Sequence, residues 1–285
     1  MNTKKEEQWD LIIKPRTPLF NLELQEIWQY RDLLLLMVKR DIITVYKQTI
    51  LGPIWFFLQP VFTTLIFTIV FSEIAGLSTG STPAILFYLS GLIVWNFFSE
   101  TLLSTSKTFT ENSAVFGKVY FPRLIMPISK TISGFLKFFI QLGLFLSVLA
   151  FFAVVKGMEV HLHSALIFLP LLFLLMALLG LGSGIILSSL TTKYRDLIFL
   201  INFGVQLLMY ATPVIIPLSE VPLKYLWIIK LNPMTSVIET FRYAFLGAGE
   251  LDLAGLCYST VFTACLLLIG IIIFNRVQKT FIDTI

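Results

Sequence analysis

Glu111 to Pro127, ENSAVFGKVYFPRLIMP, is a basic segment punctuated by prolines that lies between two long uncharged apolar runs. Each run is about as long as a bilayer crossing, which takes about 20 residues. A polar segment between two crossings lies at one face of the membrane, open to water. It carries no set of side chains for catalysis, so we predict that it is a docking surface on which a separate soluble subunit pushes.

The composition of the whole chain is that of an integral membrane protein. Hydrophobic residues make up 56% of the 285 positions and charged residues 13%, and the mean hydropathy is +0.86. Soluble domains carry about 25% charged residues, so this chain holds roughly half the usual share. The first fifty residues contain no apolar core followed by a small-residue cleavage site, so we expect no cleaved signal peptide.

The predicted fold class is an all-α membrane protein with six transmembrane helices, because lipid cannot hydrogen-bond an open backbone. Residues 1–50 form the cytoplasmic N-terminal segment, and residues 51–285 form the transmembrane domain. The six predicted spans, each containing an uncharged run, are 51–74, 82–103, 128–155, 164–190, 197–217 and 253–275. Loop 104–127 joins spans two and three and includes the opening segment.

The lysine and arginine residues sort to one side of this predicted bundle. Eight precede the first span, five lie in loop 104–127 and the start of span three, and two each follow spans four and six; four lie on the opposite side. By the positive-inside rule, both termini are cytoplasmic. Because the basic residues follow membrane sidedness, the net charge of +4 does not indicate a nucleic-acid partner.

Two further segments are helical but too charged or too short to span. Leu22–Gln48 has apolar residues at helical spacing among charges, which predicts an N-terminal amphipathic helix in the cytoplasmic interface; a soluble helix packed on a partner is the alternative. Residues 221–246, between spans five and six, predict a pair of external re-entrant half-helices. Asn232-Pro233 is the turn between them, with the proline opening the second piece. Glu239 and Arg242 on that piece are three apart and are expected to pair, although Arg242 could also hold an anionic group.

The nearest approach to a nucleotide-binding loop is Gly117-Lys118. Asn112 occupies the place of the first glycine, Val119 occupies that of the Ser or Thr, and the segment follows a membrane helix rather than a strand. We therefore predict that this chain does not bind ATP through a phosphate-binding loop, and we predict no cofactor in it.

Other chemistries lack the side chains that they need. None of the six uncharged runs contains Asp or Glu, which argues against an ion-coupled carrier. His161 and His163, with Glu159, are too few ligands for a metal site, and no Ser–His–acid set is visible on one side. We therefore predict no metal site, no catalytic residue and no enzymatic activity.

Small and aromatic residues mark packing positions and surfaces in the predicted spans. Gly180, Gly182 and Gly184 in span four allow close helix approach. Interfacial belts explain most aromatic residues near span ends, but rings that face a pore would let sugars stack on them. The candidates for that role are Trp55, Phe56, Tyr88, Trp95 and Tyr210.

Short motifs spread over nearly the whole chain together resemble one family. The chain is similar to the membrane subunit of bacterial type-2 ABC exporters, specifically the permeases for O-antigen, teichoic acid or capsule polysaccharide. The matching pieces are Val38-Lys39-Arg40-Asp41, Leu51-Gly52-Pro53, Gln59-Pro60, Asn112, Lys118 through Pro122, Pro127, Tyr194-Arg195-Asp196, Thr212-Pro213-Val214, Leu231-Asn232-Pro233-Met234 and Phe241-Arg242. Each piece is modest alone, and their order is what is specific.

The resemblance implies a homodimer of this chain above two ATPase subunits, which would hold the ATP and Mg²⁺. It implies a coupling helix within 112–127 that inserts into the ATPase, an interface helix at Leu22–Gln48 and an external gate formed by Asn232, Pro233, Glu239 and Arg242. The residues expected to contact the ATPase are Asn112, Phe116, Lys118, Tyr120, Arg123, Tyr194, Arg195 and Asp196. Glycine is costly within a helix, so we expect the coupling helix to end near Gly117.

The expected function is ATP-driven export of an O-antigen-like glycan on an undecaprenyl pyrophosphate carrier across the bacterial cytoplasmic membrane. Lys39, Arg40 and Lys47 would attract the pyrophosphate, and the glycan would pass the aromatic candidates and the external gate. Export of teichoic acid, capsule, a drug or a small lipid by the same fold stays open. A channel or ion-coupled carrier, and a membrane enzyme of glycan assembly, are the more distant alternatives.

Overall fold

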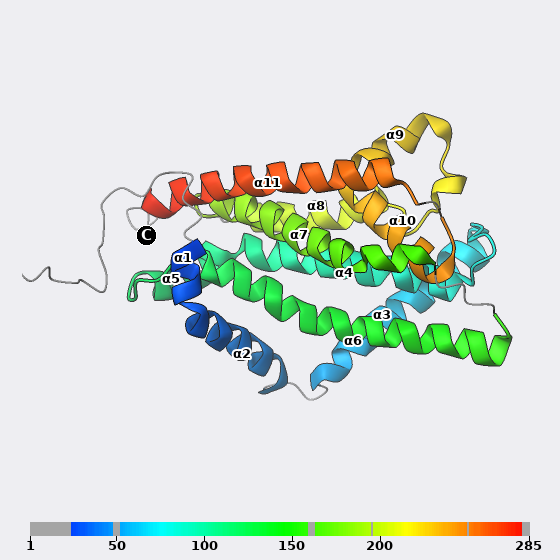
Figure 1. The fold of residues 1–285 in the computed structure, drawn as a ribbon, viewed down its shortest axis with the longest axis horizontal. Helices are drawn as coiled ribbons and strands as arrows, with labels where there is room; N and C mark the ends of the chain where they lie inside the picture. Colours follow the sequence, from blue (N-terminus) through cyan, green and yellow to red (C-terminus); the bar gives the residue numbers. More distant parts are fainter. Residues whose placement is uncertain (1–23, 48–51, 159–162, 195, 250, 281–285) are drawn as a thin grey trace, which may run out of the picture.

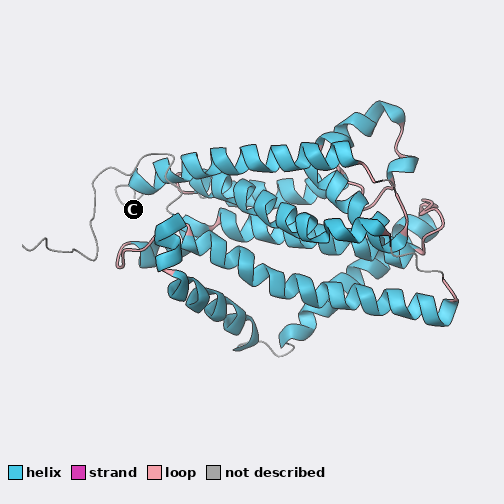
Figure 2. Cartoon of the chain, viewed as in Figure 1, coloured by secondary structure: helices cyan, strands magenta, loops and turns pink. Residues whose placement is uncertain are grey.

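The computed structural model describes residues 24–47, 52–158, 163–194, 196–249 and 251–280, and every regular element within these ranges is a helix (Figures 1 and 2). The predicted all-α class is therefore confirmed. The elements are α1 (Leu24–Gln29), α2 (Arg31–Lys47), η1 (Gly52–Ile54), α3 (Trp55–Phe67), η2 (Thr68–Ile74), α4 (Ala84–Ser106), α5 (Thr108–Phe116), α6 (Ile125–Lys156), η3 (Ser164–Phe168), α7 (Leu169–Thr191), α8 (Leu197–Tyr210), η4 (Leu218–Glu220), α9 (Leu223–Leu231), α10 (Pro233–Leu246) and α11 (Leu253–Thr280).

Five helical stretches of the described chain are long and apolar enough to cross a membrane, where the sequence predicted six. They are Trp55–Ile74, Ala84–Ser106, Ile125–Lys156, Ser164–Thr191 and Leu253–Gln278. The predicted fifth span, 197–217, contains only the 14-residue apolar helix α8. A helix of that length rises about 21 Å, less than the roughly 30 Å of hydrocarbon. The chain leaves the helix after Tyr210 and continues as a turn past Pro213 and Pro217, which lack the N–H that a helix requires.

The two ends of the bundle differ in which segments gather there. Helices α1 and α5 and the C-terminal end of α11 lie at one end, and α9 and α10 lie at the other (Figure 1). These three segments, which the distribution of lysine and arginine assigned to one side of the membrane, therefore lie at the end of the molecule opposite α9 and α10.

Helix α4 is the centre of the bundle. In an apolar stretch of 18 residues of α4, 78% of the residues are buried inside the chain. The corresponding share is 11% for the stretch that contains α3 and 22% for those of α6 and α11. Helix α4 contacts α3, α6, α7, α8 and α10. Helix α4 therefore contacts other segments along most of the length of the fold.

Glycines let α7 approach its neighbours closely, as the small-residue cluster predicted. A Cβ on Gly184 would lie 2.5 Å from Cβ of Thr105 in α4, and one on Gly180 would lie 2.9 Å from Cβ of Thr101. Gly182 is on the other side of α7, where a Cβ would lie 2.6 Å from Leu266 of α11. Close backbone approach of this kind is how helices gain contact in lipid, where no hydrophobic force drives them together.

We expect Gly184→Ala to destabilise the protein, because the added methyl group must push α4 away from α7. Overpacking of this kind costs about 1–3 kcal/mol. The matched control is Gly204→Ala in α8, where a Cβ would meet nothing within 4 Å. Thermal unfolding midpoints of the purified protein in detergent measure both changes. Equal midpoints for the two variants would contradict the close packing of α4 on α7.

Candidate functional site

The helices α9 and α10 meet at Asn232, which caps the start of α10. The Asn232 side-chain oxygen accepts a hydrogen bond from the N–H of Met234 at 3.0 Å, and Pro233 is the first residue of α10. This confirms the predicted turn and the predicted place of the proline. The other end of α10 stops at Gly247, whose φ of 63° is the left-handed conformation that favours glycine.

Arg242 of α10 is buried, with 1% of its surface exposed, and its guanidinium group lies among polar groups at the end of the bundle opposite α1 and α5 (Figure 1). Nη1 lies 3.3 Å from the Glu239 carboxylate, which confirms the predicted pair, and also donates to the carbonyl of Pro213. Nη2 donates to the carbonyls of Val214 at 3.1 Å and Phe87 at 3.2 Å. The guanidinium also lies over the Phe87 ring, 3.6 Å from its centroid. We call Arg242 with these three carbonyls the Arg242 network.

The Arg242 network joins three segments that are far apart in the sequence: α10, the turn after α8 and the start of α4. Gly91 of α4 leaves the space for it, since a Cβ there would lie 2.5 Å from Nη2 of Arg242 and 3.2 Å from Cα of Val214. Hydrogen bonds from a charged donor contribute about 1.5–3 kcal/mol each. Because these donors are occupied by backbone carbonyls, Arg242 acts as a structural connection here rather than as an anion site.

The segment predicted to couple to a soluble subunit forms a helix followed by an exposed turn. Helix α5 ends at Phe116 with Gly117 as its C-cap, where the sequence placed the end. Phe116 and Asn112 were expected to contact a partner, but both are buried in the chain. The Asn112 amide donates to the Thr108 carbonyl at 2.9 Å. Phe116 packs with other aromatic rings, among them Phe109, 5.9 Å away between centroids.

These buried rings attach the coupling segment to the rest of the bundle. Phe109 stacks on Phe274 of α11 at 4.7 Å between centroids, and its N–H donates to the Ser188 hydroxyl of α7 at 3.4 Å. Arg123, another expected partner contact, donates to the carbonyl of Gln278 in the last turn of α11, and burial lowers the pKa of its guanidinium. Arg123 therefore supplies a hydrogen-bond donor to the C-terminal end of α11, where helix carbonyls lack internal donors.

The surface left for a partner at this end is formed by four of the expected residues. Lys118 is exposed, and Tyr120 is 61% exposed in the turn that follows α5. Tyr194 and Asp196, in the connection between α7 and α8, are exposed as well. The neighbouring Arg195 lies outside the described residues.

The basic residues of the amphipathic helix lie along α2. Lys39, Arg40 and Lys47 are exposed, and Arg40 pairs with the adjacent Asp41 at 2.8 Å. Asp41 also lies 3.3 Å from the ammonium group of Lys130 in α6. The carboxylate of Asp41 thus holds α2 against α6 and leaves the three basic side chains at the surface.

The five aromatic candidates divide between the core and the surface. Tyr88 and Trp95 are 0% and 3% exposed and pack inside the chain, so in this conformation neither ring is available to a passing sugar. Trp55 and Tyr210 are more than half exposed, and Phe56 is partly exposed with its ring 5.4 Å from the Lys137 ammonium group. Periodicity could not separate these groups, because α4 is surrounded on all sides.

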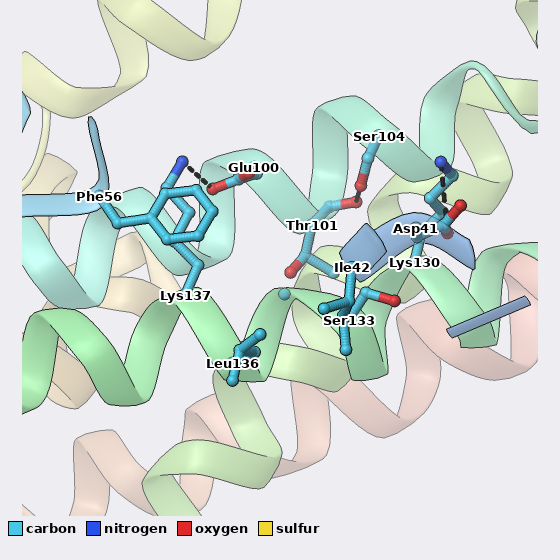
Figure 3. Close-up of a pocket in the computed structure, with 11 residues that line it drawn as sticks. Asp41, Ile42, Phe56, Glu100, Thr101, Ser104, Lys130, Ser133, Leu136 and Lys137 are labelled. Atoms are coloured by element: carbon cyan, nitrogen blue, oxygen red, sulfur yellow. Dashed lines mark hydrogen bonds and ion pairs between the residues drawn. The ribbon is translucent and has the colours of Figure 1, made fainter. Parts of the chain in front are cut away.

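The structure adds a groove with charged residues in its walls that the sequence did not indicate. It lies between α2, α3, α4 and α6, and Glu100 of α4 pairs across it with Lys137 of α6 at 2.7 Å (Figure 3). The uncharged run in this region ends at Ser99, whereas α4 continues through Glu100 to Ser106. Asn96, Glu100 and Ser104 follow at intervals of four, and this polar stripe on one helix face is the signal that could have indicated the groove.

Comparison with known proteins gives consistent matches over most of the chain. Residues 32–246 match the sequence profile described as ABC-2 type transporter. Two proteins of Klebsiella pneumoniae named O-antigen export system permease protein RfbA are 27% and 28% identical, and each alignment covers 88% of this chain and 94% of the relative. A protein of the same name from Myxococcus xanthus is 26% identical over 78% of this chain and 83% of its own length.

We expect Arg242→Lys to lower the free energy of unfolding by about 3–5 kcal/mol, the usual loss when a buried charge loses its partners. Lysine keeps the positive charge, but its single nitrogen cannot reach the carbonyls that the planar guanidinium bridges. The matched control is Arg276→Lys at an exposed position of α11. The fraction of each variant that stays monodisperse after heating measures the effect. If both variants resist heat equally, the Arg242 network does not stabilise this end of the bundle.

Proposed function

The chain belongs to the ABC-2 type transporter family, and we propose that it is the permease subunit of an ATP-driven exporter of lipid-linked, O-antigen-like polysaccharide. The observation that carries the proposal is the match along nearly the whole chain to relatives named as O-antigen export permeases. The family assignment makes it a membrane subunit for transport. Five apolar helices of spanning length support its place in a membrane, which we propose is the bacterial cytoplasmic membrane.

We propose that two copies of this chain assemble with two ATPase subunits, which bind the ATP and Mg²⁺. Members of this family normally work with an ATPase partner. The exposed turn with Lys118 and Tyr120, together with Tyr194 and Asp196, offers the partner a surface at one end of the bundle. The distribution of lysine and arginine supports a cytoplasmic location for this end and an outward location for α9 and α10.

The packing of α5 suggests how a push on this surface would reach the membrane helices. Helix α5 begins two residues after α4 ends, and Phe109 contacts both α7 and α11. Densely packed interiors transmit displacement because side chains have little free space. A movement of α5 driven by the ATPase would therefore tilt α4, α7 and α11 together, and the Arg242 network connects α4 onward to the external gate.

For the substrate, we propose that the pyrophosphate is attracted to Lys39, Arg40 and Lys47 on α2. We propose that the glycan contacts the exposed rings of Trp55 and Tyr210 and the partly exposed ring of Phe56. Tyr88 and Trp95 are not included in this proposal, because both are buried. The gate residues Asn232, Pro233, Glu239 and Arg242 lie at the opposite end from the proposed docking surface (Figure 1).

We expect Tyr120→Asp to reduce the amount of ATPase subunit that purifies with the permease by at least about tenfold, because a charge would replace an exposed apolar contact. Removing one interface hot spot typically costs 2 kcal/mol or more. The control is Tyr225→Asp in α9, where the tyrosine is 50% exposed at the other end of the bundle. Normal recovery of ATPase with the Tyr120 variant would remove this turn from the docking surface.

Replacing Lys39, Arg40 and Lys47 together with Gln should reduce export of the glycan to the cell surface, because the headgroup loses its electrostatic attraction. The ATPase should still purify with this variant. The matched control replaces the exposed Lys224 and Lys230 of α9 with Gln. Surface glycan is measured in cells that lack the natural copy of the gene. Full export by the triple variant would exclude these residues from substrate capture.

A further inference from the structure

The groove between α2, α3, α4 and α6, which we call the α4–α6 groove, contains a cavity of about 190 Å³ (Figure 3). Its walls come from Asp41, Phe56, Glu100, Thr101, Lys130 and Lys137, among others. A second hollow of about 380 Å³ adjoins it and shares Glu100 and Lys137. At about 30 Å³ per water in liquid water, the first cavity has room for about six water molecules, which is comparable to one sugar ring.

The charges of the first cavity cancel. Lys137 pairs with Glu100 at 2.7 Å and Lys130 pairs with Asp41 at 3.3 Å. A phosphate group would have to compete with these carboxylates for the lysines and would be repelled by them. A neutral ligand that both donates and accepts hydrogen bonds meets no such repulsion, and carboxylates are strong acceptors for its hydroxyl groups.

Thr101 in the wall of the cavity carries a buried hydroxyl group. Thr101 is 2% exposed, and its Oγ1 atom has no hydrogen-bond partner within the described part of the chain. In Figure 3 this hydroxyl is directed toward α6. Gly134 of α6 also lines the cavity, and a Cβ there would lie 3.4 Å from the Phe97 ring. A Cβ on Gly134 would lie 3.8 Å from Thr101 Oγ1. Buried polar groups are almost always satisfied, so a ligand or water is expected at this point.

We propose that the α4–α6 groove binds the first sugar of the lipid-linked glycan, the residue attached to the pyrophosphate. This inference rests on the proposed function, which makes the substrate a glycan on a pyrophosphate lipid. Asp41 in the cavity wall is adjacent in sequence to Arg40 and two residues from Lys39, so a pyrophosphate held by α2 would place its sugar at the groove. The ring of Phe56 lies 5.4 Å from the Lys137 ammonium group and gives the cavity wall an apolar surface for the sugar.

The test compares two probes on the purified permease–ATPase complex in lipid nanodiscs: undecaprenyl pyrophosphate alone, and the same lipid carrying one N-acetylhexosamine. Thr101→Val replaces the hydroxyl group with a methyl group of similar size, and Gly134→Leu fills the cavity. The matched control is Gly143→Leu on the same helix, where a Cβ would meet nothing within 4 Å. Both groove variants should weaken binding of the sugar-bearing probe by about three- to tenfold, the range for one lost hydrogen bond, and leave the bare lipid within twofold. The control should change neither.

Three other results would overturn the inference, and one of them also addresses the proposed function. Equal weakening of both probes would assign the groove to the pyrophosphate or to folding. No change in either variant would exclude the groove from binding. If the unaltered complex binds neither probe and its ATPase responds to neither, the proposed glycan substrate itself fails, whatever the variants do.

Discussion

The end of the bundle that contains α10 depends on the hydrogen bonds from the Arg242 guanidinium group to three backbone carbonyls. After α8 ends at Tyr210, the chain runs as a buried turn through Thr212, Pro213 and Val214. In lipid, irregular backbone of this kind is tolerated only where protein groups satisfy it. Arginine has five donors in a rigid plane and can bridge separate carbonyls, which no other side chain does equally well. One side chain therefore joins the buried turn, α10 and the start of α4.

The two ends of the molecule are joined through α4. At the end near α10, Phe87 of α4 accepts a hydrogen bond from Arg242, and Gly91 of α4 leaves the space for its guanidinium group. At the other end, α5 follows α4 and attaches through Phe109 to α7 and α11. Because the α4 span is largely buried and packed on glycine contacts with α7, it has little freedom to bend independently of its neighbours. The fold thus contains one continuous element between the proposed docking surface and the proposed gate.

Local signals in the sequence were enough to predict the features that depend on hydropathy or on a few adjacent residues. The all-α class, the turn at Asn232-Pro233, the Glu239–Arg242 pair and the end of α5 at Gly117 are of this kind. The sequence overestimated the length of the fifth apolar helix, and it could not indicate which faces of a helix other segments cover. Asn112 and Tyr88 are buried because distant segments pack on them. The carbonyl partners of Arg242 and the Glu100–Lys137 pair join residues that are remote in the sequence, so spacing along one helix could not indicate them.

The Arg242 network also has a consequence for biosynthesis. Arg242 follows its carbonyl partner Phe87 by 155 residues and Val214 by 28. The turn after α8 leaves the ribosome before α10 does, so its Pro213 and Val214 carbonyls reach the membrane without the arginine that finally donates to them. This end of the bundle can therefore be completed only after α10 has been made and has folded back onto earlier helices. Nascent chains that stop before Arg242 would display unfinished polar backbone in lipid, a recognisable mark for membrane quality control.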